Sequence, residues 1–162
     1  MAGVRNENVV AILLESTALD KEFIEWPLHI TIVPWFHGYD AKKLDDLLAG
    51  ISKTHKSFKA QVGPLEKFGY KKEVEVNVID DCDQLRKLHW AVFNILENNG
   101  FIIHQKDFVG DNYRPHITRQ PKSHKDKGDE VEVRFFALVK QERLKKSGAI
   151  VKTIVKQYEL VG

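Results

Sequence analysis

LHITIVPWF, residues 28–36, is the stretch from which the fold can be worked out. Its branched apolar residues predict a β-strand. Because strand side chains alternate, His29 and Thr31 share one face, while Ile30 points to the other. The same His-Ile-Thr triplet returns as residues 116–118 in the segment YRPHITRQ. One short chain therefore presents the same polar pair on two predicted strands.

Hydrophobic spacing predicts the elements around the first triplet. Residues 8–16 form a nearly continuous apolar run, which indicates a strand buried on both faces. Behind Asp40, which can cap a first turn, leucines at helical spacing predict a helix to about Lys53. A strand is expected over residues 57–63, with turns at 63–64 and 69–72. Residues 74–78 alternate between apolar and polar, which predicts a strand with one solvent-exposed face.

The second half of the chain begins with another predicted helix. Apolar residues at helical spacing over 85–96 form a core-facing stripe, with Asp81 or Asp83 as the expected cap and residues 99–100 as the stop. An exposed loop is expected over residues 121–130. The last two predicted strands span residues 130–140 and 152–160.

This order of elements predicts an α+β fold. We expect a single domain, residues 1–162, built as two pseudo-symmetric lobes of mainly antiparallel sheet with outer helices. Each lobe would bring one His-x-Thr motif to a shared central cleft.

Composition limits the class of protein. The chain is 43% hydrophobic and 30% charged, as in ordinary globular proteins, and its net charge of +2 is too small for a duplex-DNA-binding protein. The single cysteine, Cys82, excludes an intramolecular disulfide. The first ten residues lack the basic flank and apolar run of a secretion signal, so we expect none. No apolar run approaches the ~20 residues of a membrane span. We expect a cytoplasmic monomer that does not contact membranes.

The repeated motif suggests phosphoester chemistry. His-x-Thr on a strand places two Cα atoms ~6.5 to 7 Å apart, so an imidazole and a hydroxyl can reach one tetrahedral group. Imidazole, with an ordinary pKa of ~6.5, can take or give a proton near neutral pH. Two such histidines could deprotonate a water and protonate a departing oxygen, while the threonines bind phosphoryl oxygens. Hydrolysis of a cyclic phosphodiester by this route needs no metal and no cofactor.

Either triplet alone is more often a polar residue at a sheet edge, and only the repetition in two apolar strands favours a site. We expect structural roles for the remaining histidines, His37, His55, His89, His104 and His124. His37 and His124 each follow a motif histidine by eight residues, but no Asp or Glu stands at consistent ligand spacing. We therefore expect no metal site.

Together with their flanks, the motifs resemble those of the two-histidine (2H) phosphoesterase superfamily, most closely its 2′-5′ RNA ligase-like branch of RNA 2′,3′-cyclic phosphodiesterases. The matching segments are LHITIVPWFHG, LEKFGYKKEVEVNVI, LRKLHWAVFNILENNGF, YRPHITRQ and the stretch from VRFFALVK to the C-terminal strand. The resemblance implies a pseudo-twofold fold and metal-independent opening of a cyclic phosphate at an RNA or nucleotide end. It also implies that His29 is the proton donor, His116 the proton acceptor, and Thr31 and Thr118 the phosphate ligands.

Further substrate contacts are less specific. Arg119 directly follows Thr118, where the branch continues with apolar residues, and a phosphate or base contact is one interpretation of it. Tyr113 and Phe68 are candidates for stacking on a base. The lysines of LKKSG, residues 144–148, favour a solvated face over an RNA-binding track.

Three alternatives remain open. The same site could act on ADP-ribose cyclic phosphate, a 2′-5′-linked oligonucleotide or a non-nucleotide phosphoester. The chain could also be a non-catalytic RNA- or nucleotide-binding module, although such a module has no use for two proton-transfer groups. In a purely structural protein the triplets would be coincidental.

Overall fold

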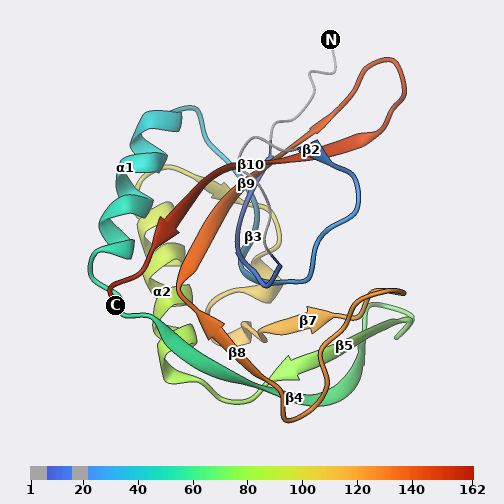
Figure 1. The fold of residues 1–162 in the computed structure, drawn as a ribbon. Helices are drawn as coiled ribbons and strands as arrows, with labels where there is room; N and C mark the ends of the chain where they lie inside the picture. The colour runs from blue at the N-terminus through green and yellow to red at the C-terminus, as the bar shows by residue number, and fades with distance from the viewer. Residues whose placement is uncertain (1–6, 16–21) are drawn as a thin grey trace.

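The computed structural model describes residues 7–15 and 22–162, which form one ten-stranded sheet with α-helices packed on one face (Figure 1). The strands are β1 (Glu7–Leu13), β2 (Glu22–Phe23), β3 (His29–His37), β4 (Phe58–Phe68), β5 (Val74–Ile79), β6 (Ile102–Ile103), β7 (His116–Thr118), β8 (Glu130–Val133), β9 (Phe135–Arg143) and β10 (Ile150–Glu159). The helices are α1 (Ala41–Ser52) and α2 (Asp83–Asn98), and two short 3-10 turns span Lys106–Phe108 and Gly110–Asn112. The predicted α+β class is confirmed.

The two motif strands are neighbours at the middle of the sheet. The strand order is β2-β10-β9-β1-β3-β7-β5-β4-β8, with β6 beside β3, and the strand pairs are antiparallel. β3 and β7 join the two halves through one pair, Ile30 opposite Ile117. From the sequence we expected two halves that follow one another along the chain. The structure differs, because the closing strands β9 and β10 lie in the same half of the sheet as β3.

The main core lies between the sheet and the helices. Ile30 and Ile117 are fully buried there, together with the leucine stripes of α1 and α2. Burying a leucine or isoleucine side chain contributes ~1.5 to 3 kcal/mol, so this core fixes which face of each motif strand turns inward. In the described part of the chain, neither helix combines the length and the apolar character that spanning a membrane requires.

The start of α1 and both ends of α2 test the helix boundaries predicted from the sequence. Asp40 caps α1 as expected, accepting a hydrogen bond from the Lys43 amide at 2.9 Å. Asn99 ends α2, followed by Gly100 at φ +81°, which confirms the predicted stop. The predicted cap of α2 is wrong, because Cys82 holds that position without a side-chain hydrogen bond.

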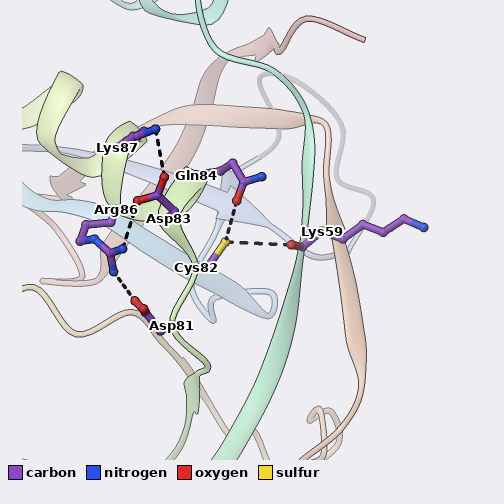
Figure 2. A network of polar contacts seen from close by, with 7 residues as sticks. All are labelled: Lys59, Asp81, Cys82, Asp83, Gln84, Arg86 and Lys87. Atoms are coloured by element: carbon purple, nitrogen blue, oxygen red, sulfur yellow. Dashed lines mark hydrogen bonds and ion pairs between the residues drawn. The ribbon is translucent and has the colours of Figure 1, made fainter.

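The two aspartates beside Cys82 form ion pairs with basic side chains of α2 instead of capping the helix (Figure 2). Arg86 contacts both Asp81 and Asp83, and Lys87 pairs with Asp83 at 2.9 Å. These contacts keep negative charge at the start of α2, where the helix dipole favours it, without a capping hydrogen bond.

Three predicted element boundaries were wrong. Gly63-Pro64 makes no turn, because β4 continues to Phe68 and a bulge between Val62 and Leu65 accommodates the proline. Glycine is required at position 63, since a Cβ atom there would lie 2.8 Å from the Val78 carbonyl oxygen.

The strand predicted over 130–140 is divided at Arg134. β8 pairs with β4, whereas β9 pairs with β1 and β10, so the chain crosses between the sheet halves at this point. The first predicted strand ends at Leu13 rather than at 16, and residue 16 lies outside the described residues. The wet face predicted for 74–78 is also interrupted, because Asn77 is buried and donates to the Gly63 carbonyl oxygen.

His89 joins three parts of the fold inside the core. Its Nδ1 donates to the Ile32 carbonyl of β3 at 2.7 Å, and its Nε2 accepts from the Gly110 amide at 2.9 Å. The ring also stacks on Tyr113, with centroids 3.9 Å apart. The hydrogen bond from the Gly110 amide requires an unprotonated Nε2, and therefore the neutral ring. Burial lowers the pKa of His89 and so also favours the neutral ring, although the hydrogen bond to the Ile32 carbonyl raises this pKa.

We expect His89→Ala to lower the free energy of unfolding by about 3 kcal/mol, because it removes two buried hydrogen bonds and leaves a cavity. The matched control His124→Ala changes an exposed histidine and should stay within about 0.5 kcal/mol. Denaturant unfolding at pH 7.5 measures both. Since the fold holds His89 neutral, its contribution is complete above pH 6.5 and is lost as the pH falls through its lowered pKa. Equal, small effects of both substitutions would contradict this role.

Candidate functional site

The register of β3 and β7 brings the two triplets together. Continuing the single β3–β7 pair by one residue in each direction places His29 opposite Thr118, and Thr31 opposite His116. Directly opposed side chains on antiparallel strands have Cβ atoms about 4.5 to 5.5 Å apart. All four side chains point away from the helices, because the isoleucine between each pair is buried on the helix side. Each histidine is thus beside the threonine of the other motif.

His29 is half-buried and held from two sides. Its Nδ1 lies 3.0 Å from the Pro27 carbonyl oxygen, and the Trp26 ring stacks on it at a centroid distance of 4.2 Å. Burial lowers the pKa of His29, the hydrogen bond to Pro27 opposes that shift, and the nearby His116 and Lys152 lower the pKa further.

His116 has a matching environment. Its Nδ1 lies 2.9 Å from the Arg114 carbonyl oxygen, and its ring meets the Phe68 ring edge-on at 4.7 Å. Burial lowers the pKa of His116; the hydrogen bond to the Arg114 carbonyl raises it, and the Arg114 guanidinium lowers it. That guanidinium lies over Phe68 and donates to both carboxylate oxygens of Glu66 at 2.8 and 2.9 Å.

The two backbone contacts determine which nitrogen of each histidine can react. A carbonyl oxygen only accepts hydrogen bonds, so Nδ1 of both His29 and His116 must carry a proton. The lone pair or second proton of each ring is therefore on Nε2. The carbonyl two residues earlier orients each ring in the same way, which leaves two Nε2 atoms for proton transfer.

A cavity of about 610 Å³ lies in front of the two histidines. That volume is within the ~300 to 1,000 Å³ typical of small-molecule sites. It is lined by both histidines, by Thr31 and by several aromatic side chains, namely Trp26, Trp35, Phe68, Phe108 and Tyr113. Thr118 shares the face of His116 but is not among the lining residues. The lining thus combines flat apolar surfaces with the polar groups of His29, His116 and Thr31.

Tyr113 lines the cavity, but its hydroxyl and one face of its ring already contact other residues of the protein. Its hydroxyl donates to the Thr31 carbonyl oxygen at 2.7 Å, one ring face stacks on His89, and burial raises its pKa well above the usual range. These contacts make Tyr113 a support for β3 at the motif, a role that the sequence did not suggest. Phe68, the other predicted stacking residue, lines the cavity.

Arg119 is directed away from the cavity. Its guanidinium donates to the Asn77 side-chain oxygen at 2.9 Å and to the Lys125 carbonyl oxygen at 3.0 Å, and it lies 3.3 Å from Asp126. The residue follows Thr118 on the strand, so alternation sends it to the opposite face. These contacts anchor the 121–130 loop and give no support to the substrate contact predicted for Arg119.

The sequence analysis did not single out two residues that lie near the site, Trp26 and Lys152. Trp26, three positions before the first motif histidine, stacks on His29, and its position was a signal that could have been read. Lys152 has its Nζ 5.9 Å from the Trp26 ring centroid, and nothing local in the sequence connects β10 with β3.

The other histidines form contacts outside the cavity. His37 and His104 lie with their ring nitrogens 2.7 Å apart, and Glu7 is 3.6 Å from His104. Within residues 7–15 and 22–162, no group of three or more His, Cys, Asp or Glu side chains has an arrangement suited to a metal ion. That the reaction proceeds without metal stays a prediction.

Comparisons with known proteins identify structures with the same fold and a family whose model matches this chain. A comparison with curated protein sequences found no significant match. The crystal structure of TT0787 from Thermus thermophilus matches 96% of this chain and 98% of its own, with 18% identity and a TM-score of 0.63. That of Escherichia coli LigT complexed with 3′-AMP matches 97% and 99%, with 15% identity and a TM-score of 0.66.

A third structure, described as a phosphoesterase, matches 97% of this chain and 99% of its own, with 14% identity and a TM-score of 0.64. At these identities the structures show a shared fold. The sequence profile of the 2′-5′ RNA ligase superfamily matches residues 9–153, which include both motifs. The chain therefore belongs to the 2′-5′ RNA ligase superfamily, a branch of the two-histidine phosphoesterases.

Proposed function

We propose that this protein is a metal-independent phosphodiesterase that hydrolyses 2′,3′-cyclic phosphate ends of RNA or related nucleotides. One observation carries the proposal: His29 and His116 line one cavity, and each has its Nδ1 bound to a backbone carbonyl. Two oriented Nε2 atoms at one cavity are what a reaction with one proton acceptor and one proton donor needs.

The proposed reaction has one nucleophile and one leaving group. The neutral histidine takes a proton from water through Nε2, and the water oxygen attacks phosphorus. The bond from phosphorus to one ribose oxygen breaks, and the protonated histidine gives its Nε2 proton to that oxygen. The family resemblance assigns donation to His29 and acceptance to His116. The hydroxyl of Thr31, and that of Thr118, would donate hydrogen bonds to the phosphoryl oxygens as their charge grows.

The cavity supports a nucleotide as the substrate. Its aromatic lining offers stacking surfaces for a base, and its volume accommodates a nucleoside phosphate. LigT, which shares the fold, has been crystallised with 3′-AMP, with ATP and with NADP+. The same site could serve a 2′-5′ linkage, as the name of the superfamily suggests, because the two histidines can exchange roles in the reverse direction.

Hydrolysis of 2′,3′-cyclic AMP and of a short RNA with a 2′,3′-cyclic phosphate end, both in EDTA, tests the proposal. We expect turnover by the wild type and a loss of about 10² to 10⁴ in kcat for His116→Ala, the usual size of a general acid or base contribution. His124→Ala, which changes an exposed histidine outside the cavity, should keep full activity. An active His116→Ala variant, or a wild type that EDTA inactivates, would contradict the proposal.

The pH dependence of kcat/KM should be bell-shaped and displaced toward acid. Burial lowers the pKa of both His29 and His116 below 6.5, and the reaction needs one ring neutral and the other protonated. Above both pKa values the proton donor is lost, and below both the acceptor is lost. We therefore expect a maximum below about pH 6.5 and a fall of about tenfold per pH unit on the alkaline side. A rate that rises steadily from pH 5 to 9 would exclude this pair of groups.

A further inference from the structure

The hairpin between β9 and β10 extends beyond the rest of the sheet (Figure 1). Residues 140–156 contain six lysines and arginines and one glutamate, a net charge of +5, whereas the whole chain carries only +2. The positive charge of the protein is therefore concentrated on this ribbon, and the remainder of the chain is net negative. A ribbon of this charge attracts polyanions.

One face of the ribbon is continuous with the cavity. In the β9–β10 ladder, Arg143 is opposite Ile150 and Lys152 is opposite Gln141, so the two cations share a face. Lys152 lies over the Trp26 ring, and Trp26 stacks on His29. The same register places Ile154 on this face, where it packs with Trp26 in a small apolar cluster. Arg143 and Lys152 therefore extend the cavity face of the sheet outward from His29.

Two acidic side chains of the ribbon and of its neighbour β2 lie on the opposite face. Glu142 is opposite Val151, and Glu22 is opposite Thr153, which puts both carboxylates on the other face. Glu7 is on the cavity face by register, but its carboxylate is directed to His104, 3.6 Å away.

Among residues 7–15 and 22–162, the two cations on the cavity face of the ribbon have no carboxylate partner, unlike those nearer the second motif. Arg114 pairs with Glu66, and Arg119 lies 3.3 Å from Asp126. In contrast, within the described residues, Arg143 donates to the Gly148 carbonyl oxygen at 3.0 Å. Lys152 donates to the Ile24 carbonyl oxygen at 2.7 Å.

The turn adds Lys145 and Lys146, both exposed, beside Leu144, which is 43% exposed. Roughly 13 Å of strand, at about 3.3 Å per residue, separates Lys152 from Gly148 in this turn. Cations thus follow one another from the edge of the cavity to the tip of the hairpin.

We propose that the cavity face of this hairpin, from Lys152 through Arg143 to Lys145 and Lys146, binds the phosphodiester backbone of the single-stranded RNA that precedes the cyclic phosphate. The inference rests on the proposed function. A 2′,3′-cyclic phosphate is the 3′ end of its strand, so the rest of the RNA must leave the cavity in the 5′ direction. The lysines of residues 144–148, for which the sequence favoured a solvated face, thereby become contacts that distinguish an RNA end from a mononucleotide.

Steady-state kinetics on two substrates tests this surface. The variant Arg143→Gln/Lys145→Gln/Lys146→Gln removes three cations and leaves His29, Trp26 and Lys152 unchanged. The substrates are 2′,3′-cyclic AMP and a ten-nucleotide RNA ending in a 2′,3′-cyclic phosphate, at about 50 mM and about 200 mM KCl.

For the RNA, we expect kcat/KM at the lower salt to fall about 10-fold or more. The slope of log(kcat/KM) against log[salt] should weaken by about 2, since each phosphate contact on a single strand contributes ~0.7. For cyclic AMP, kcat/KM should not change, which also verifies that the variant is folded. The control Lys42→Gln/Lys53→Gln/Lys56→Gln removes the same charge at exposed positions in and just after α1 and should leave both substrates unaffected.

The outcomes separate the two proposals. If the wild type opens cyclic AMP but the hairpin variant treats RNA as the wild type does, or both triple variants lose RNA activity equally, the hairpin is not the RNA-binding surface. If the wild type opens neither substrate, the proposed function is wrong and the inference falls with it.

Discussion

One backbone pair, Ile30 opposite Ile117, is the constraint on which the rest of this structure depends. It is the only registered pair between β3 and β7, and it joins the two halves of the sheet. Both isoleucines are buried in the core beneath the helices, so the flanking residues of each strand must point to the opposite face. The same burial that stabilises the fold therefore directs His29 and His116 toward one cavity. His89 and Tyr113 reinforce this arrangement, because they bind the carbonyls of Ile32 and Thr31 on β3.

The site is symmetric in its reacting groups and asymmetric in its surroundings. Each histidine donates from Nδ1 to the carbonyl two residues earlier, and each has one aromatic neighbour, Trp26 or Phe68. Each also has a cation nearby, but Glu66 neutralises Arg114, whereas no carboxylate pairs with Lys152 in the described residues. The unpaired charge continues along β9 and β10. In the proposed reaction, two histidines in similar surroundings would transfer protons, and the charge on one side of the cavity would give the RNA strand a single direction.

The sequence predicted those features that depend on neighbours along the chain. Alternation placed His29 and Thr31 on one face, Asp40 was recognised as a cap, and Asn99-Gly100 as a stop. It failed where several local partners were available, because Arg86 and Lys87 in the first turns of α2 pair with the aspartates expected to cap that helix. It also failed where another strand decides, because pairing with β5 places a bulge at Pro64 inside β4. Contacts such as that of Lys152 with Trp26 join residues far apart in the chain, so no local sequence pattern predicts them.

The most direct test of a single shared site is a double-mutant cycle on kcat/KM for 2′,3′-cyclic AMP with His29→Ala, His116→Ala and the double variant. If both rings act in the same step, each single substitution removes most of the catalysis, and the double variant should be within about tenfold of the worse single one. If the losses of the single variants multiply in the double variant, or if one substitution has no effect, the two triplets do not form one catalytic unit.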